Sequence, residues 1–107
     1  MYTSGFGLDE SAVEETASVM LLLSHPGRLK LMLAIQHAPH STRGQLAEDI
    51  HLDPRQVTHL LRNLRESGLI HRRKTGRSAH YSIADPAVGV LLDTLRDLAG
   101  REHALSA

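Results

Sequence analysis

The sequence predicts a mainly α-helical domain that carries one small β-hairpin. Two observations predict the helices: apolar residues recur at helical spacing in several segments, and residues that favour helix N-termini precede most of these segments. A third observation predicts the hairpin, because a strongly basic run with a Thr75-Gly76 turn joins two short strand-like segments. A chain of 107 residues is expected to form one domain, over residues 8–104, after a flexible N-terminus of residues 1–7.

Two helices are predicted in the N-terminal part of the chain. The first spans residues 8–23, where apolar side chains recur at helical spacing. His25 is expected to cap the second helix, which begins at Pro26. Proline suits this position because the backbone N–H that it lacks would have no partner within the helix. This helix is expected to run to about residue 37 and to end before Pro39.

A short helix and a tight turn follow. Thr42 and Gln45 have the spacing of a capping box, in which each side chain bonds the backbone N–H of the other residue. The box precedes an amphipathic helix over residues 46–50, and residues 51–53 form the turn.

The next predicted helix carries a polar face beside its apolar one. It spans residues 54–67, with Asp53 as its cap, and Gly68 stops it. Amide and guanidinium groups of this kind hydrogen-bond the edges of bases in a major groove. The residues predicted to enter the groove are Arg55, Gln56, Thr58, His59 and Arg62.

A basic hairpin is predicted after this helix, where residues 69–77 lead into residues 79–83. A turn at Thr75-Gly76 would set Lys74 opposite Arg77 and His71 opposite His80. Helix, turn, helix and basic hairpin in this order form a winged helix-turn-helix, in which the hairpin holds the DNA backbone beside the groove. The residues predicted to contact this backbone are Arg73, Lys74 and Arg77.

A last helix is predicted from Pro86, capped by Asp85, to about Gly100. The last helix carries an apolar stripe although the DNA-reading unit before it is already complete, so this stripe is expected to pack against a partner surface. The first helix carries a similar stripe. We therefore predict a homodimer through the first and last helices; the alternative is a last helix that folds back on its own domain. The residues predicted in the dimer interface are Val13, Met20, Val88, Leu91, Leu92 and Leu95.

The formal net charge of zero conceals a segregation of charges. Residues 43–80 hold eight Lys/Arg against four Asp/Glu, a net of +4, whereas residues 1–24 hold four acids and no base. A basic centre between acidic ends favours a polyanionic partner, although a basic cluster alone would equally suit a solvated face. The helices around the cluster favour double-stranded DNA as the partner.

Composition restricts the compartment and the chemistry. The chain has no Cys, so neither a disulfide nor a thiolate metal site is expected. Its longest apolar run, residues 19–23, is too short to cross a membrane, and we expect a cytoplasmic protein without a membrane partner. The sequence has no nucleophile motif, metal triad or Gly-rich phosphate loop, which argues against an enzyme.

Several spaced motifs occur together in this chain. They are His25-Pro26-Gly27-Arg28-Leu29, Gln45-Leu46-Ala47-Glu48, Val57-Thr58-His59-Leu60-Leu61, the segment 64–70, Arg72-Arg73 with Gly76-Arg77, and His80-Tyr81-Ser82-Ile83. With these motifs the chain resembles the ArsR/SmtB family of small dimeric winged-helix transcriptional regulators. The resemblance covers roughly residues 15–98. It implies a five-helix dimer on a near-palindromic operator, whose DNA binding responds to a ligand, commonly a metal ion. Within the family, the chain also resembles the cysteine-free, histidine-containing nickel-responsive SrnR type.

The metal sites of the family are not retained in their usual form. Ala87 stands where a last-helix His ligand is expected, and residues 41–44, which match the thiolate site, contain no Cys. A metal site is therefore expected to use His and carboxylate ligands, which suit nickel or zinc, with nickel favoured. The candidate ligands are His71 with His80 on the hairpin and Glu102 with His103 near the end of the last helix, while His37 and His40 form a further pair.

Two alternatives to a metal-responsive regulator stay open on the sequence alone. One is a winged-helix regulator that works without a metal, and the other is a winged helix that binds only proteins. A salt-dependent shift of promoter DNA would separate a DNA-binding regulator from a protein-binding module.

Overall fold

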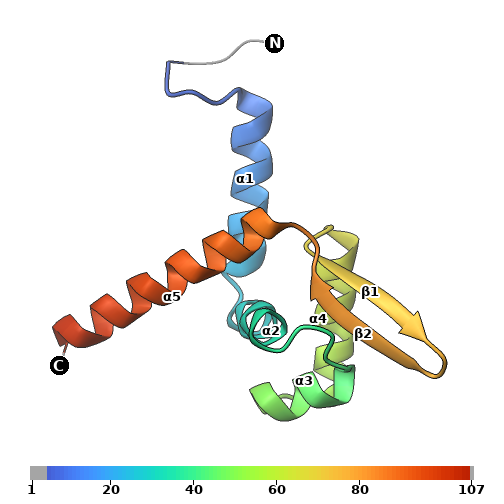
Figure 1. Cartoon of the computed structure of the whole chain (residues 1–107). Coiled ribbons are helices and arrows are strands. Elements are labelled where there is room, and N and C mark those ends of the chain that lie inside the picture. Colours follow the sequence, from blue (N-terminus) through green and yellow to red (C-terminus); the bar gives the residue numbers. More distant parts are fainter. Residues whose placement is uncertain (1–4, 107) are drawn as a thin grey trace.

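The computed structural model describes residues 5–106, with side chains to residue 102. In this part of the chain five helices and a two-stranded antiparallel hairpin confirm the predicted fold class (Figure 1). Residues 1–4 of the predicted flexible N-terminus lie outside the described residues. The elements are α1 Glu10–Leu23, α2 Pro26–His37, α3 Arg43–Ile50, α4 Pro54–Glu66, β1 Ile70–Thr75, β2 Ser78–Ile83 and α5 Pro86–Ser106.

α2, α3 and α4 start at the predicted caps His25, Thr42 and Asp53, whereas α1 starts at Glu10, after the cap Asp9, and not at residue 8. Nδ1 of His25 accepts hydrogen bonds from the backbone N–H groups of Gly27 and Arg28, at 3.1 and 3.3 Å. At α3, Thr42 Oγ1 accepts from the N–H of Gln45 at 3.3 Å, and Gln45 Oε1 accepts from the N–H of Thr42 at 2.9 Å. These bonds pair N–H groups that the first turn of a helix leaves without a partner, which is why the capping residues mark the helix starts.

The end of α5 differs from the prediction. Gly100 was expected to stop the helix, but α5 continues to Ser106. A glycine inside a helix costs only about 1 kcal/mol relative to alanine, and several of the residues that follow are good helix formers. Gly100 is therefore an interior residue of a 21-residue helix.

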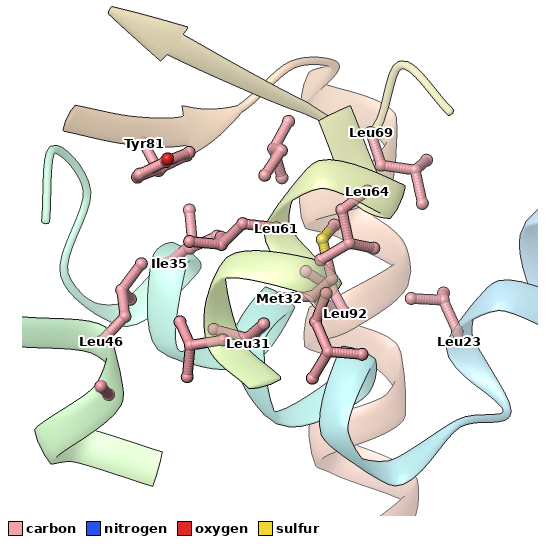
Figure 2. Close-up of a cluster of buried hydrophobic side chains, with 14 residues drawn as sticks. Leu23, Leu31, Met32, Ile35, Leu46, Leu61, Leu64, Leu69, Tyr81 and Leu92 are labelled. Carbon is pink, nitrogen blue, oxygen red and sulfur yellow. The ribbon is translucent and has the colours of Figure 1, made fainter. Parts of the chain in front are cut away.

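The hydrophobic core surrounds α2, which contacts the other four helices and β2. Leu31, Met32 and Ile35 of this helix are fully buried, and buried side chains from every neighbouring element point toward them (Figure 2). Besides these three, the core contains Leu23, Leu46, Ala47, Val57, Leu60, Leu61, Leu64, Leu69, Ile70, Tyr81 and Leu92.

Leu92 belongs to this core, which corrects its assignment to the dimer interface. Its side chain is 0 % exposed in a single chain, so no partner could contact it. Val88, Leu91 and Leu95 of the same stripe are half-buried against the core. Helical spacing shows that one face of a helix is apolar, but it does not distinguish a face covered by the same chain from one covered by a partner.

The register of the hairpin also differs from the prediction. His71 pairs with Ser82 and His80 pairs with Arg73, so the two histidines do not face each other. The reason is the turn, which lies at residues 76–77 instead of residues 75–76. Gly76 takes φ +62° at the first position of this two-residue turn, a conformation that suits glycine in type II′ hairpin turns.

α1 and α5 extend away from the body formed by the other elements (Figure 1). In the described part of the chain, all the exposed large hydrophobic side chains lie in these two helices or just before α1. They are Phe6, Leu8, Val13, Met20, Leu21, Val90 and Leu98. Within residues 5–106 no single helix is long and apolar enough to cross a membrane; α1 and α2 meet the length and composition test only as a pair bent by 94°.

Polar bonds attach the first half of α5 to α2. Gln36 Nε2 donates to the carbonyl oxygen of Gly89 at 2.9 Å and to Oδ1 of Asp93 at 2.8 Å. Arg96 in turn donates to Gln36 Oε1 at 3.1 Å and to the carbonyl oxygen of Leu33 at 2.9 Å. These contacts set the direction in which α5 leaves the body.

Candidate nucleic-acid interface

The exposed face of α4 carries most of the residues predicted to enter a groove. Arg55, Gln56, His59 and Arg62 are all exposed. The opposite face of α4, which includes Leu64, is buried in the core. The helix is therefore anchored by one face and presents guanidinium, amide and imidazole groups on the other, which is the arrangement needed to read base edges.

Thr58, the fifth of these residues, is half-buried and already bonded within the protein. Its hydroxyl donates to the carbonyl oxygen of Pro54 at 2.9 Å and accepts from Nη1 of Arg43 at 3.2 Å. Thr58 thereby ties the first residue of α3 to α4. The sequence did not suggest this contact, because it joins residues that are 15 positions apart.

A basic cleft of about 350 Å³ lies between the N-terminus of α3 and the hairpin. Arg43, Arg72 and Arg77 line it, and we call it the arginine cleft. A smaller hollow of about 180 Å³ continues from it along α4, where Arg62 and Arg65 join Arg43 and Arg72. No Asp or Glu lines either of them. A surface of this kind attracts a polyanion, and guanidinium groups form paired hydrogen bonds with phosphate oxygens.

The register of the hairpin explains why Arg72 belongs to this cleft. Arg72 pairs with Tyr81, whose side chain is buried, so Arg72 lies on the face of the hairpin that is turned toward the body. Arg73, which was predicted as a backbone contact, lies on the opposite face. The predicted contacts Lys74 and Arg77 lie at the end of the hairpin, and all three side chains are exposed.

Arg43 and Arg72 are the cleft residues that sequence reasoning missed. Both lie in the basic segment 43–80, but neither belongs to the polar stripe of α4. A correct register of the hairpin would have placed Arg72 on the inner face, next to Tyr81. The contact between Arg43 and α4 has no sequence pattern that would reveal it.

The predicted metal ligands on the hairpin, His71 and His80, lie on one face of it but are not directly opposed. His80 Nδ1 is 2.8 Å from the carbonyl oxygen of His40, which identifies Nδ1 as the hydrogen-bond donor of this pair. Glu102 lies in α5, far along the chain from the hairpin, and the side chain of His103 falls outside the described residues. Where the structure describes side chains, no group of three or more His, Cys, Asp or Glu residues could hold a metal ion.

Comparisons with known proteins agree with this geometry. A family model described as winged helix-turn-helix DNA-binding matches residues 28–71. The chain is 37% identical over 86 residues to the HTH-type transcriptional regulator NmtR of Mycobacterium tuberculosis, and the alignment covers 80% of this chain and 71% of that protein.

Solved structures resemble the fold over most of its length. A predicted DNA-binding transcriptional regulator from Escherichia coli matches with a TM-score of 0.78 and 26% identity, covering 83% of this chain and 94% of that one. The transcriptional repressor BigR from Xylella fastidiosa matches with a TM-score of 0.77 and 26% identity, over 83% of this chain and 90% of that one.

Proposed function

Because this chain belongs to the ArsR/SmtB family of winged helix-turn-helix transcriptional regulators, we propose that it binds a near-palindromic operator as a homodimer. Like its relatives, the chain is a DNA-binding regulator and not an enzyme. In the proposed complex α4 enters the major groove, and the arginine cleft and the hairpin hold the flanking phosphates. Such a regulator acts in the cytoplasm, where its operator is.

The observation that carries this proposal is the continuity of the basic surface. Arg62 on the exposed face of α4 lines the smaller hollow, which shares Arg43 and Arg72 with the arginine cleft. The cleft in turn reaches the hairpin turn through Arg77. One surface therefore offers groups for base edges beside groups for phosphates, and sequence-specific DNA binding needs both.

The test is a titration of the chain's own promoter DNA, followed by fluorescence anisotropy at several salt concentrations. We expect saturable binding that weakens steeply with salt, because each neutralised phosphate releases counterions. A scrambled duplex of the same length is the control and should bind more weakly. Equal binding to both duplexes would contradict specific recognition, and no binding at low salt would favour a protein-binding module.

The homodimer is supported by where the exposed apolar side chains lie. Large hydrophobic groups that remain exposed together mark interaction surfaces, and among the described side chains, residues 5–102, they lie in α1, in α5 and just before α1. Of the predicted interface residues, Val13 and Met20 are exposed, at 40% and 46%. Leu21 and Val90, which are 72% and 65% exposed, join them as candidates.

A double variant, Leu21→Asp with Val90→Asp, is expected to be monomeric by light scattering at concentrations at which the parent is dimeric. Neither residue belongs to the core, so the circular dichroism spectrum should be unchanged. Thr75→Asp, which adds a charge on the exposed hairpin, is the control and should have the same dimer mass by light scattering as the parent protein. A double variant that keeps the mass of the parent would remove α1 and α5 from the interface.

The finer part of the proposal is a response to a divalent metal, with nickel favoured over zinc. In a chain without Cys, His and carboxylate groups are the side chains that suit nickel or zinc, and the Nδ1 contact of His80 leaves its Nε2 as the acceptor nitrogen. Metal-binding imidazoles are commonly held in this way. The described side chains of one chain do not fit a complete site, however, so we confine the proposal to ligands shared between two chains.

The metal response is tested by calorimetric titration of the dimer with nickel and with zinc. Single substitutions His71→Ala, His80→Ala and His103→Ala show whether the hairpin or the end of α5 supplies ligands. Unchanged nickel affinity in all three would remove both candidate sites, and no heat of binding in the parent would leave a metal-independent regulator.

A further inference from the structure

A second cleft lies on the other flank of α4, where the N-terminal turns of α2 and α4 meet. Its volume is about 530 Å³, within the usual range of about 300–1,000 Å³ for small-molecule sites. We call it the α2–α4 cleft. Its lining includes Arg55, Gln56 and His59, the first three exposed residues of the recognition face of α4.

The wall of this cleft is largely apolar. Pro26, Leu52 and Leu60 provide hydrocarbon surface. The backbone of α2 comes close to α4 at Gly27, where an added Cβ would lie 3.0 Å from both Cε1 of His25 and Cδ1 of Leu60. A side chain at this position would therefore press on the wall of the cleft. Such a surface favours a ligand that brings apolar area of its own.

The polar groups around the cleft favour negative charge. Lys30 and Arg55 line it, and no Asp or Glu does. Gly27 in the first turn of α2 and Arg55 in the first turn of α4 also line it. Their backbone N–H groups are paired with His25 Nδ1 and Asp53 Oδ1, so the side chains of Lys30 and Arg55 supply the positive charge. The ligand that complements this charge is an anion.

We propose that the α2–α4 cleft binds a small organic acid, with an apolar or aromatic body and one carboxylate, and that this ligand competes with DNA. The body lies against Leu52 and Leu60, and the carboxylate is held by Lys30 and Arg55. A DNA phosphate satisfies the charge but leaves the apolar wall uncovered, so the lining favours the organic acid. The competition rests on the proposed function, because Arg55, Gln56 and His59 belong both to the cleft and to the face of α4 that would contact DNA. The binding of the acid itself does not rest on the proposed function.

Binding is tested on the full chain without DNA, by following its backbone amide NMR signals during titration with 2-naphthoate to about 10 mM. We expect the signals of Gly27, Lys30, Leu52 and Gln56 to shift together and to saturate. 2-Naphthamide has the same ring system without the charge, and inorganic phosphate has the charge without the ring; both should shift these signals at least about tenfold less at equal concentration.

Lys30→Glu is the variant that tests the charge requirement. Lys30 is exposed in the first turns of α2, where an acidic residue also suits the helix N-terminus, so the fold should be retained. We expect 2-naphthoate to bind at least about tenfold more weakly, because an attractive charge becomes repulsive. Arg101→Glu makes the same change near the far end of α5 and should leave the affinity unchanged.

Three results would overturn the inference. The first two are the absence of saturable shifts in these residues and binding of 2-naphthamide as tight as that of 2-naphthoate. The third is a set of phosphate shifts as large as those of 2-naphthoate, which would make the cleft a second binding site for DNA phosphate. Competition is measured separately, as a rise in the apparent Kd for operator DNA when 2-naphthoate is saturating. Saturable binding without that rise overturns the competition alone, whereas failure of the chain to bind DNA without ligand overturns the proposed function.

Discussion

The arginine cleft and the α2–α4 cleft flank the same helix but surround an anion differently. Arg43, Arg72 and Arg77 converge in the arginine cleft, whereas the α2–α4 cleft combines Lys30 and Arg55 with an apolar wall. Several guanidinium groups suit a phosphate, which takes paired hydrogen bonds and stays partly hydrated. An apolar wall instead stabilises a ligand in proportion to the hydrocarbon area that it covers.

The difference comes from the element beside α4 on each flank. The hairpin and the first residue of α3 contribute long cationic side chains, which reach across an open space. α2 contributes Pro26 and Gly27, which bring its backbone close to α4 and leave little room for polar groups. The two flanks of one recognition helix can therefore serve different ligands.

The largest effect is expected from the double variant Arg43→Ala with Arg72→Ala, which removes two cations from the arginine cleft. Operator affinity near 0.15 M salt should fall by about 10- to 100-fold, and the salt slope should decrease by about two, since each phosphate contact contributes about 0.9. Anisotropy titrations at several salt concentrations measure both. Arg101→Ala is the matched control, and a double variant with the parent's slope would show that the cleft does not hold phosphates.

The next effect is expected from Gln56→Ala, which alters a residue shared by the recognition face and the α2–α4 cleft. Losing an amide contact to a base should cost about 1–3 kcal/mol at one position of the operator. Because the amide is neutral, the salt slope should not change. Affinities for operators with single base changes measure this, and an unaltered base preference would mean that Gln56 does not enter the groove.

A pair of glycine substitutions compares the crowding of the two clefts. Gly27→Ala should destabilise the fold by about 1–3 kcal/mol, because its Cβ would meet side chains of the same chain at 3.0 Å. Gly44→Ala, in the arginine cleft, meets only Thr42 Oγ1 at 4.0 Å and should stabilise α3 by up to about 1 kcal/mol. Urea unfolding measures both. Opposite signs are expected, and equal destabilisation would mean that the two clefts are equally tight.

The smallest effect concerns the cap at the edge of the α2–α4 cleft. His25→Asp should preserve the bonds to the N–H groups of Gly27 and Arg28 and add a negative charge at the start of α2. A stabilisation of about 0.3–1 kcal/mol is expected at low salt, declining as salt is added. Thermal unfolding at two salt concentrations measures it, and His25→Ala, which removes the cap, should destabilise by about 1 kcal/mol. A destabilised Asp variant would show that the imidazole also contributes packing.

The parts of the fold that were predicted correctly depend on local chemistry. Thr42 with Gln45, and Asp53 before Pro54, satisfy N–H groups within three residues, so sequence neighbours alone determine these helix starts. The exposed face of α4 was predicted for the same reason, because helical spacing separates its polar from its apolar residues.

The errors and omissions depend on contacts between distant parts of the chain. The His71–His80 pairing failed because a one-residue displacement of the turn shifts the register by two. Leu92 was assigned to a partner because its burial depends on the packing of α5 against α2 and β2, which the spacing within α5 does not reveal. Both clefts form where three or more segments meet, and no one segment of the sequence carries the pattern of such a site.

Because α5 is attached to the body by one half only, a small change in its angle there would displace its free end. Gln36 and Arg96 hold only its first half, while the whole helix is about 31 Å long at 1.5 Å per residue. A tilt of about 10° in the attached half would move the free end, which lies about 15 Å beyond Arg96 at 1.5 Å per residue, by about 3 Å. In the proposed dimer, the spacing between the two copies of α4 would change with that angle, and operator half-sites lie about one helical turn of DNA, or a multiple of it, apart. The side chains of Gln36 and Arg96, which lie far from any base, would thus help to determine which half-site spacing the regulator accepts.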